Sequence, residues 1–171
     1  MLSLRHKASL AALSAVCLGA VLTIAATSAS ASSTVSGSPS AATPYCTVTI
    51  SNSTVGPEQC YATQASMDAA IPNVLTVISV DYIDANYRGD SLTWTVSGSV
   101  TCNIFPSYQA SSMPSGWNDI VSSYIDYANC NRNPHYENIR FTGAVADCGP
   151  NCSYIGNAMN DRTSSEKWGS R

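Results

Sequence analysis

The sequence predicts an all-β protein, and three observations support this prediction. Short stretches rich in β-branched and aromatic residues alternate with clusters of Gly, Pro, Asn and Ser, a pattern typical of strands joined by turns. Only 11% of the 171 residues are charged and 44% are apolar, which argues against an extended disordered chain. Two pairs of similar strings after residue 73 indicate an internal repeat of one folding unit.

Residues 1–31 have the features of an export signal. Arg5 and Lys7 precede an apolar run that ends at the small-residue site Ala29-Ser30-Ala31. Its removal takes two of the eight basic residues and none of the eleven acidic ones, which leaves a net charge of about −5. We therefore expect a secreted, extracellular protein with no membrane segment after signal removal. The acidity and the lack of basic clusters argue against a nucleic-acid partner.

The rest of the chain divides by composition. Residues 32–44 are almost all Ser, Ala, Thr, Gly and Pro, so we expect a flexible tether. Residues 45–76 form an N-terminal extension, with a strand at 47–50 and a short helix within 59–71 that Pro72 ends. Residues 77–171 form the main domain. The strand-like stretches from residue 74 onward are 74–82, 91–96, 121–127, 139–141 and 165–168.

Six cysteines follow the export signal, an even number that predicts up to three disulfides in an exported chain. The spacing of Cys148 and Cys152 favours a local disulfide over a zinc turn, because zinc would need two further Cys or His ligands. Local closeness alone makes Cys102 with Cys130 and Cys46 with Cys60 the simplest remaining pairs. The sequence leaves 15 connectivities open for six cysteines.

The internal repeat consists of two strings, each present twice. Residues 82–89 (YIDANYRG) and 136–143 (YENIRFTG) share the form aromatic-x4-aromatic-x-Gly. Residues 118–123 (NDIVSS) and 160–165 (NDRTSS) share Asn-Asp-x-x-Ser-Ser. The strings occur in the order hairpin, loop, hairpin, loop, which is far more specific than any one of them alone.

In these strings the chain resembles the βγ-crystallin family over residues 77–168. The resemblance is greatest to the small secreted bacterial members, a group that includes metalloproteinase inhibitors and killer-toxin-like proteins. It implies a single domain of two Greek keys in a β-sandwich. The extension at 45–76 and a long first loop depart from the minimal family pattern.

The hairpin residues have a structural interpretation. Gly89 and Gly143 fit positions where a hairpin folds back with φ > 0 and a side chain would clash. The aromatic residues Tyr82, Tyr87, Tyr136 and Phe141 would pack over the bend. The last serines of the loops, Ser123 and Ser165, would tie each loop to its folded hairpin by hydrogen bonds.

The loops offer oxygen ligands of the kind that Ca²⁺ prefers. Side-chain oxygens come from Asn118, Asp119 and Ser122 in one loop and from Asn160, Asp161 and Ser164 in the other. The family resemblance adds the backbone carbonyls of Ile120, Arg162, Ile83 and Glu137, and it implies two Ca²⁺ ions with the two keys sharing ligands. With about one carboxylate per site, we expect modest affinity and a role for calcium in stabilising the fold. The alternative interpretation is that these Asn, Asp and Ser residues only form Asx turns.

Other motifs point to weaker hypotheses. The string Gly89-Asp90-Ser91-Leu92 copies the start of a hydrolase signature, but it lacks the context of a catalytic triad, so we expect no enzyme. We interpret His135 as a hydrogen-bonded surface group. A second hypothesis for function is inhibition of an extracellular metalloproteinase through the long loop at 103–113, with Phe105 and Tyr108 as contacts. A third is a secreted toxin on the same scaffold. We expect a monomer.

Overall fold

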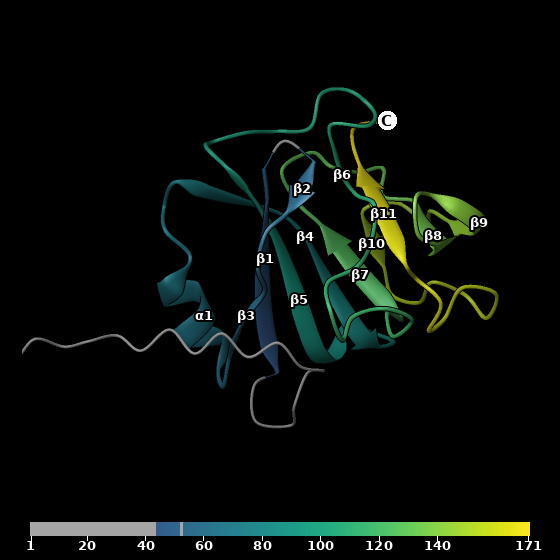
Figure 1. Cartoon of the computed structure of the whole chain (residues 1–171), viewed down its shortest axis with the longest axis horizontal. Coiled ribbons are helices and arrows are strands. Elements are labelled where there is room, and N and C mark those ends of the chain that lie inside the picture. The colour runs from purple at the N-terminus through teal and green to yellow at the C-terminus, as the bar shows by residue number, and fades with distance from the viewer. Residues whose placement is uncertain (1–43, 52) are drawn as a thin grey trace, which may run out of the picture. The chain divides into compact units, whose positions relative to one another are not determined.

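The computed structural model describes residues 44–51 and 53–171, so the expected export signal and most of the tether lie outside the described residues. In the described part of the chain, strands form two sheets and residues 64–70 form a short helix (Figure 1). The elements in chain order are β1 (Tyr45–Ser51), β2 (Thr54–Val55), β3 (Gln59–Tyr61), α1 (Gln64–Ala70), β4 (Leu75–Asp84), β5 (Arg88–Ser97), β6 (Tyr108–Ala110), β7 (Ser123–Asp126), β8 (His135–Asn138), β9 (Thr142–Ala146), β10 (Asn151–Cys152) and β11 (Ser165–Trp168).

The strand order confirms two Greek keys. One sheet has the order β10-β7-β4-β5-β1-β2, with β3 also paired to β1, and the other has the order β6-β11-β8-β9. Strands β4 to β7 make one key and β8 to β11 the other. In each key the fourth strand returns to pair with the first, β7 with β4 and β11 with β8. The third strand of each key joins the other key's sheet, because β6 pairs with β11 and β10 with β7. This exchange connects the keys into one sandwich.

The extension at 45–76 contributes a strand to the first sheet. Strand β1 runs parallel to β5, in register from Tyr45 opposite Ser91 to Ile50 opposite Val96. Its residues Cys46, Val48 and Ile50 are at most 2% exposed. Alternation in the sequence predicts this strand, but only the fold shows that it covers the edge of β5.

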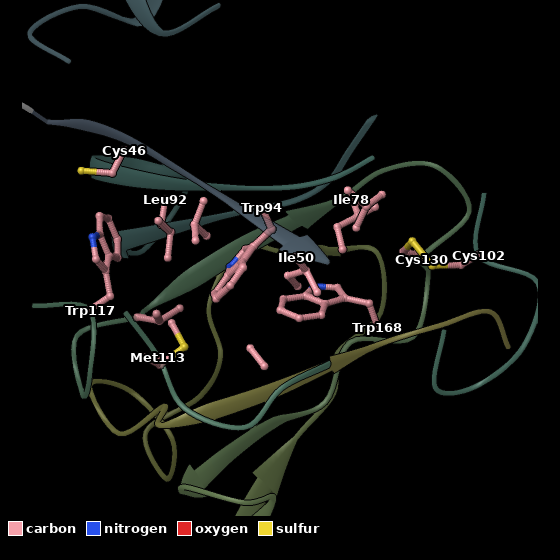
Figure 2. Packing of buried hydrophobic residues seen from close by; sticks show 14 residues of the cluster. Cys46, Ile50, Ile78, Leu92, Trp94, Cys102, Met113, Trp117, Cys130 and Trp168 are labelled. Atoms are coloured by element: carbon pink, nitrogen blue, oxygen red, sulfur yellow. A yellow bond between two sulfur atoms is a disulfide. The ribbon is translucent and has the colours of Figure 1, made fainter. Parts of the chain in front are cut away.

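The core lies between the two sheets and is built around three tryptophans. Trp94 from β5 and Trp168 from β11 have ring centroids 4.8 Å apart, and both are fully buried with Trp117 (Figure 2). Aliphatic residues from β1, β4 and β5 pack on them: Val48, Ile50, Ile78, Leu92 and Val96. Burying these large side chains is the main stabilising contribution of the fold.

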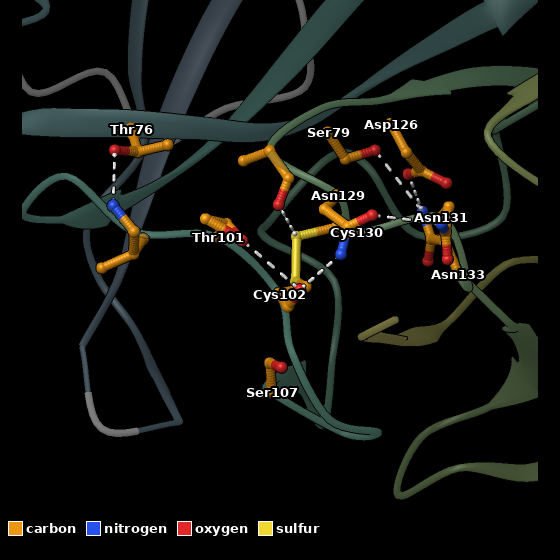
Figure 3. Close-up of a disulfide and its surroundings, with 12 residues drawn as sticks. Thr76, Ser79, Thr101, Cys102, Ser107, Asp126, Asn129, Cys130, Asn131 and Asn133 are labelled. Carbon is orange, nitrogen blue, oxygen red and sulfur yellow. Dashed lines mark hydrogen bonds between the residues drawn. A yellow bond between two sulfur atoms is a disulfide. The ribbon is translucent and has the colours of Figure 1, made fainter. Parts of the chain in front are cut away.

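The three disulfides confirm the pairing that local closeness favours. The bonds are Cys46–Cys60, Cys102–Cys130 and Cys148–Cys152, with Cα atoms 4.0, 4.9 and 5.5 Å apart. The bond between Cys102 and Cys130 fastens the start of the long first loop to the turn after β7 (Figure 3). No helix in the described residues is long and apolar enough to span a membrane.

Two predictions about local structure are wrong. Residues 139–141 are the bend between β8 and β9 rather than a strand, since Arg140 and Phe141 have φ of 58° and 63°. The predicted helix is shorter, because it begins only after its N-cap, Thr63, whose side chain accepts from the Ser66 N–H. Residues before the cap instead form β3, where the disulfide to β1 holds Cys60 opposite Cys46.

Candidate functional site

Both hairpins fold back as the repeat predicts. The bend after β4 has Asn86 and Tyr87 at φ of 62° and 61°, matching the bend after β8. Gly89 and Gly143 follow at φ of 77° and 82°. A Cβ atom on Gly89 would lie 2.6 Å from the Ile83 side chain, so the glycine is required by both conformation and space.

The aromatic residues of each hairpin pack edge to face. Ring centroids are 6.0 Å apart for Tyr82 and Tyr87, and 5.7 Å apart for Tyr136 and Phe141. Edge-to-face pairs of this kind contribute beyond the area that they bury. The structural interpretation of these residues is therefore confirmed.

A buried serine ties each loop to its hairpin in the same way. The Ser123 hydroxyl donates to the Asp84 carbonyl at 2.6 Å and accepts from the Tyr87 N–H at 3.0 Å. In the second key, the Ser165 hydroxyl donates to the Asn138 carbonyl at 2.7 Å and accepts from the Phe141 N–H at 3.0 Å. These bonds satisfy backbone groups of the bend and fix where each loop ends and the next strand, β7 or β11, begins.

The two loops lie against each other and exchange polar contacts. Ser122 of the first loop donates to Oδ1 of Asp161 in the second at 3.2 Å. Ser164 of the second loop donates to Oδ1 of Asp119 in the first at 3.1 Å. Both serines are nearly buried and both aspartates are exposed. Each aspartate is therefore paired with a serine of the other key.

The backbone holds this arrangement. Asp119 and Asp161 adopt φ of 61° and 55°. Their N–H groups donate across to the other loop, to the carbonyls of Thr163 at 3.0 Å and Val121 at 3.2 Å. Asp tolerates the left-handed conformation better than most residues do, which explains its position in both loops.

The remaining predicted ligands lie beside these groups. Asn118 and Asn160 each donate to Oδ2 of the aspartate that follows, at 2.6 and 2.7 Å. The N–H of Ser122 donates to the carbonyl of Tyr82, and that of Ser164 to the carbonyl of Tyr136. These bonds place the next residues, Ile83 and Glu137, next to the two loops. Ile120 and Arg162 follow the aspartates directly in the chain.

The Arg162 guanidinium is held by groups outside the serine and aspartate pairs. It forms an ion pair with the Glu137 carboxylate and donates to the Ala158 carbonyl at 2.9 Å. The Ala144 N–H and Arg162 together lower the pKa of Glu137 below its usual range. Arg162 therefore neutralises a neighbouring carboxylate while its own carbonyl stays in the loop.

The residues proposed for protein contact are packed against the domain. The Arg132 guanidinium carbon lies 3.7 Å from the centre of the Phe105 ring. Tyr108 belongs to β6, a short strand within the long first loop. Both rings are half-buried, whereas Ile104 is 63% exposed. Ser91 lies within β5 and is buried, not on the strand-to-helix turn that a serine nucleophile of that kind needs.

The interpretation of His135 as a surface group is wrong, because its side chain is fully buried. It lies close to Asp81 and Glu166, a cluster that sequence reasoning missed. One signal was present: Glu166 is two residues from Trp168, so both side chains face the same side of β11. An acidic residue on the tryptophan side of a strand indicates a buried carboxyl group.

Comparisons with known proteins give matches in structure only. No protein-family model and no curated protein sequence matches the chain. Three solved structures illustrate the similarity. A double mutant of a βγ-crystallin domain from Clostridium beijerinckii is 25% identical, with a TM-score of 0.41, and the match covers 56% of this chain and 100% of that domain. A βγ-crystallin domain from Flavobacterium johnsoniae is 20% identical, with a TM-score of 0.40 and coverage of 55% and 96%. An archaeal βγ-crystallin is 21% identical, with a TM-score of 0.38 and coverage of 54% and 98%.

The fold is evident from features of the chain itself. Two folded hairpins, two serine ties and two loops that contact each other follow one pattern in both keys. The third strand of each key pairs with the sheet of the other. The chain has a βγ-crystallin-type fold, and the solved structures that it resembles are βγ-crystallin domains from bacteria and archaea.

Proposed function

We propose that this is a secreted, non-catalytic calcium-binding protein in which two Ca²⁺ ions stabilise the domain by joining its two keys. The observation that carries the proposal is the reciprocal contact between the loops. Ser122 faces Asp161, and Ser164 faces Asp119, at 3.2 and 3.1 Å. A hydroxyl and a carboxylate oxygen from different keys are thus already adjacent at two symmetric positions.

The donor set is suited to calcium. Each position combines one carboxylate with hydroxyl, amide and backbone oxygens, and no nitrogen or sulfur ligand is needed. The aspartates are exposed, so an ion reaches them from solvent and water completes its coordination. A single carboxylate per site corresponds to weak binding, with Kd on the order of 10⁻⁵ to 10⁻³ M, as in extracellular modules.

Extracellular function is supported by the cysteines. All six cysteines of the described residues form disulfides, which persist in oxidising compartments. Inhibition of an extracellular metalloproteinase stays a second hypothesis, and its proposed contacts Phe105 and Tyr108 are half-buried against this domain's own residues.

A calcium titration by calorimetry, paired with melting curves in calcium and in chelator, tests the proposal. We expect two sites per chain and a higher melting temperature in calcium, because binding only to the folded state stabilises it. The absence of calcium binding would show that the Asn-Asp-x-x-Ser-Ser loops are turns alone. Binding without a change in melting temperature would contradict the stabilising role.

A further inference from the structure

A second group of ligand-type side chains is buried between the sheets, behind the second Asn-Asp-x-x-Ser-Ser loop, whose Thr163 hydroxyl lies 3.4 Å from His135 Nδ1. Asp81 on β4, His135 on β8 and Glu166 on β11 are all fully inaccessible to solvent. One ligand atom from each residue lies within 4.8 Å of the other two. The cluster therefore combines side chains from both keys and from both sheets.

The contacts in this cluster are incomplete. His135 Nδ1 lies 3.5 Å from Glu166 Oε1, and Trp94 Nε1 donates to Asp81 Oδ2 at 2.6 Å. Asp81 Oδ1 and both carboxylate oxygens of Glu166 are buried and, in the described part of the chain, accept from no well-aligned N–H or hydroxyl group, so only a proton held between the two carboxyl groups pairs them. A buried polar atom without a hydrogen-bond partner destabilises the fold, and an unpaired buried charge does so more strongly.

No cationic side chain compensates these carboxylates in the described residues. The arginine ion pairs there are those of Arg162 with Glu137 and of Arg171 with Asp147, all on partly or fully exposed side chains. The polar groups that contact the cluster are uncharged: the Trp94 indole N–H at Asp81 and the Thr163 hydroxyl at His135.

We propose that Asp81, His135 and Glu166 bind a divalent transition-metal ion, with Zn²⁺ as the ion that best fits these ligands. Two carboxylates balance the charge of the ion, and one neutral imidazole supplies the nitrogen that zinc accepts readily. Calcium prefers six to eight oxygen ligands, so this site differs from the loops in chemistry.

The geometry requires only a small adjustment. Ligand atoms held about 2.0–2.2 Å from one tetrahedral zinc ion are about 3.3–3.6 Å apart. The distance of 3.5 Å between His135 Nδ1 and Glu166 Oε1 already matches this spacing. The Asp81 ligand atom lies within 4.8 Å of the other two ligand atoms. Three protein ligands and one water form an ordinary zinc coordination.

The other group of ligand types in the described residues is not a metal site. It consists of Cys46, Glu58 and Cys60, and its two cysteines are disulfide-bonded to each other.

A neighbouring carboxylate provides a matched control. Asp126 is buried but lies outside the three-residue cluster, and its Oδ1 accepts from the Asn133 amide at 3.0 Å (Figure 3). The variant Asp126→Asn removes a buried carboxylate of the same region without removing a proposed ligand. The variants Asp81→Asn and Glu166→Gln replace a ligand carboxylate by an amide of equal size, which has the shape of the protonated acid and preserves packing.

The test measures bound metal on the full chain in excess calcium, so that the loops are saturated. The protein is refolded with equimolar Zn²⁺, dialysed, and its metal content is determined by mass spectrometry; refolding with Co²⁺ gives the visible absorption of a tetrahedral site. We expect one zinc per chain for the wild type and for Asp126→Asn. Asp81→Asn and Glu166→Gln should lose it while keeping a wild-type far-UV spectrum.

Two outcomes would overturn the proposal. A wild-type chain that retains no zinc and shows no cobalt spectrum would mean that Asp81 and Glu166 instead share a proton. Equal zinc retention by the wild type and both ligand variants would place the ion elsewhere. The double variant Asp119→Ala/Asp161→Ala separates this test from the calcium proposal, because it removes loop carboxylates and leaves the buried cluster unchanged.

Discussion

Replacing Asp161 by alanine removes the side-chain carboxylate of one proposed calcium site and leaves the other loop's aspartate in place. At calcium concentrations about 100-fold above Kd, each site contributes about 2.7 kcal/mol. A domain of about 130 residues unfolds with an entropy of about 0.27 kcal/mol/K, at about 2.1 cal/mol/K per residue. One site therefore raises the melting temperature by about 10 °C. We expect the variant to show about half of the wild-type calcium-induced shift.

The relevant quantity is the difference in melting temperature between calcium and chelator. Asp161 has φ of 55°, so alanine adds backbone strain of about 1–2 kcal/mol with or without the ion. That strain is present in both buffers and cancels in the difference. Differential scanning calorimetry in calcium and in chelator measures the difference in melting temperature. The control is Asp68→Ala, which removes an exposed carboxylate on α1 and should keep the full shift. If Asp161→Ala retains the whole wild-type shift, the carboxylate is a turn residue and the assignment of the site fails.

Three further predictions concern stability in the absence of added metal. Ser165→Ala should lower the free energy of unfolding in urea by about 1–3 kcal/mol, because the Asn138 carbonyl and the Phe141 N–H both lose a partner in partly buried hydrogen bonds. An unchanged midpoint would contradict the serine tie. Gly143→Ala should destabilise the domain more than Gly156→Ala, since both have positive φ but only the Gly143 Cβ meets other atoms, at 2.5 Å; equal midpoints would mean that space is not limiting. Burial raises the pKa of Asp126 from 3.8 to about 8, so between these pH values the folded state keeps a proton that the unfolded state has lost. The contribution of the protonated Asp126 side chain to the free energy of unfolding is therefore full below about pH 4 and is lost as the pH rises through 8. Urea denaturation across this range should show a shallower decline for Asp126→Asn, and parallel profiles for the two proteins would refute the assignment.

Much of this protein follows from local patterns in the sequence. The two hairpin strings determine where the chain folds back, because a bend with positive φ and no room for a side chain requires Gly89 and Gly143. The loop strings identify Asp119 and Asp161 as paired positions, and the structure places each opposite a serine of the other loop. Short separations along the chain also predicted all three disulfides.

Only the tertiary structure decided the features that depend on distant segments. The sequence shows that residues near Val48 form a strand, but its parallel pairing with β5 depends on an open sheet edge that no local pattern encodes. His135 precedes an aromatic strand in the sequence, where a polar residue is ordinarily exposed. The exchange of strands between the keys instead closes the core over it, beside Asp81 and Glu166. Burial is a property of the whole fold, because it depends on which surfaces meet when the two sheets pack.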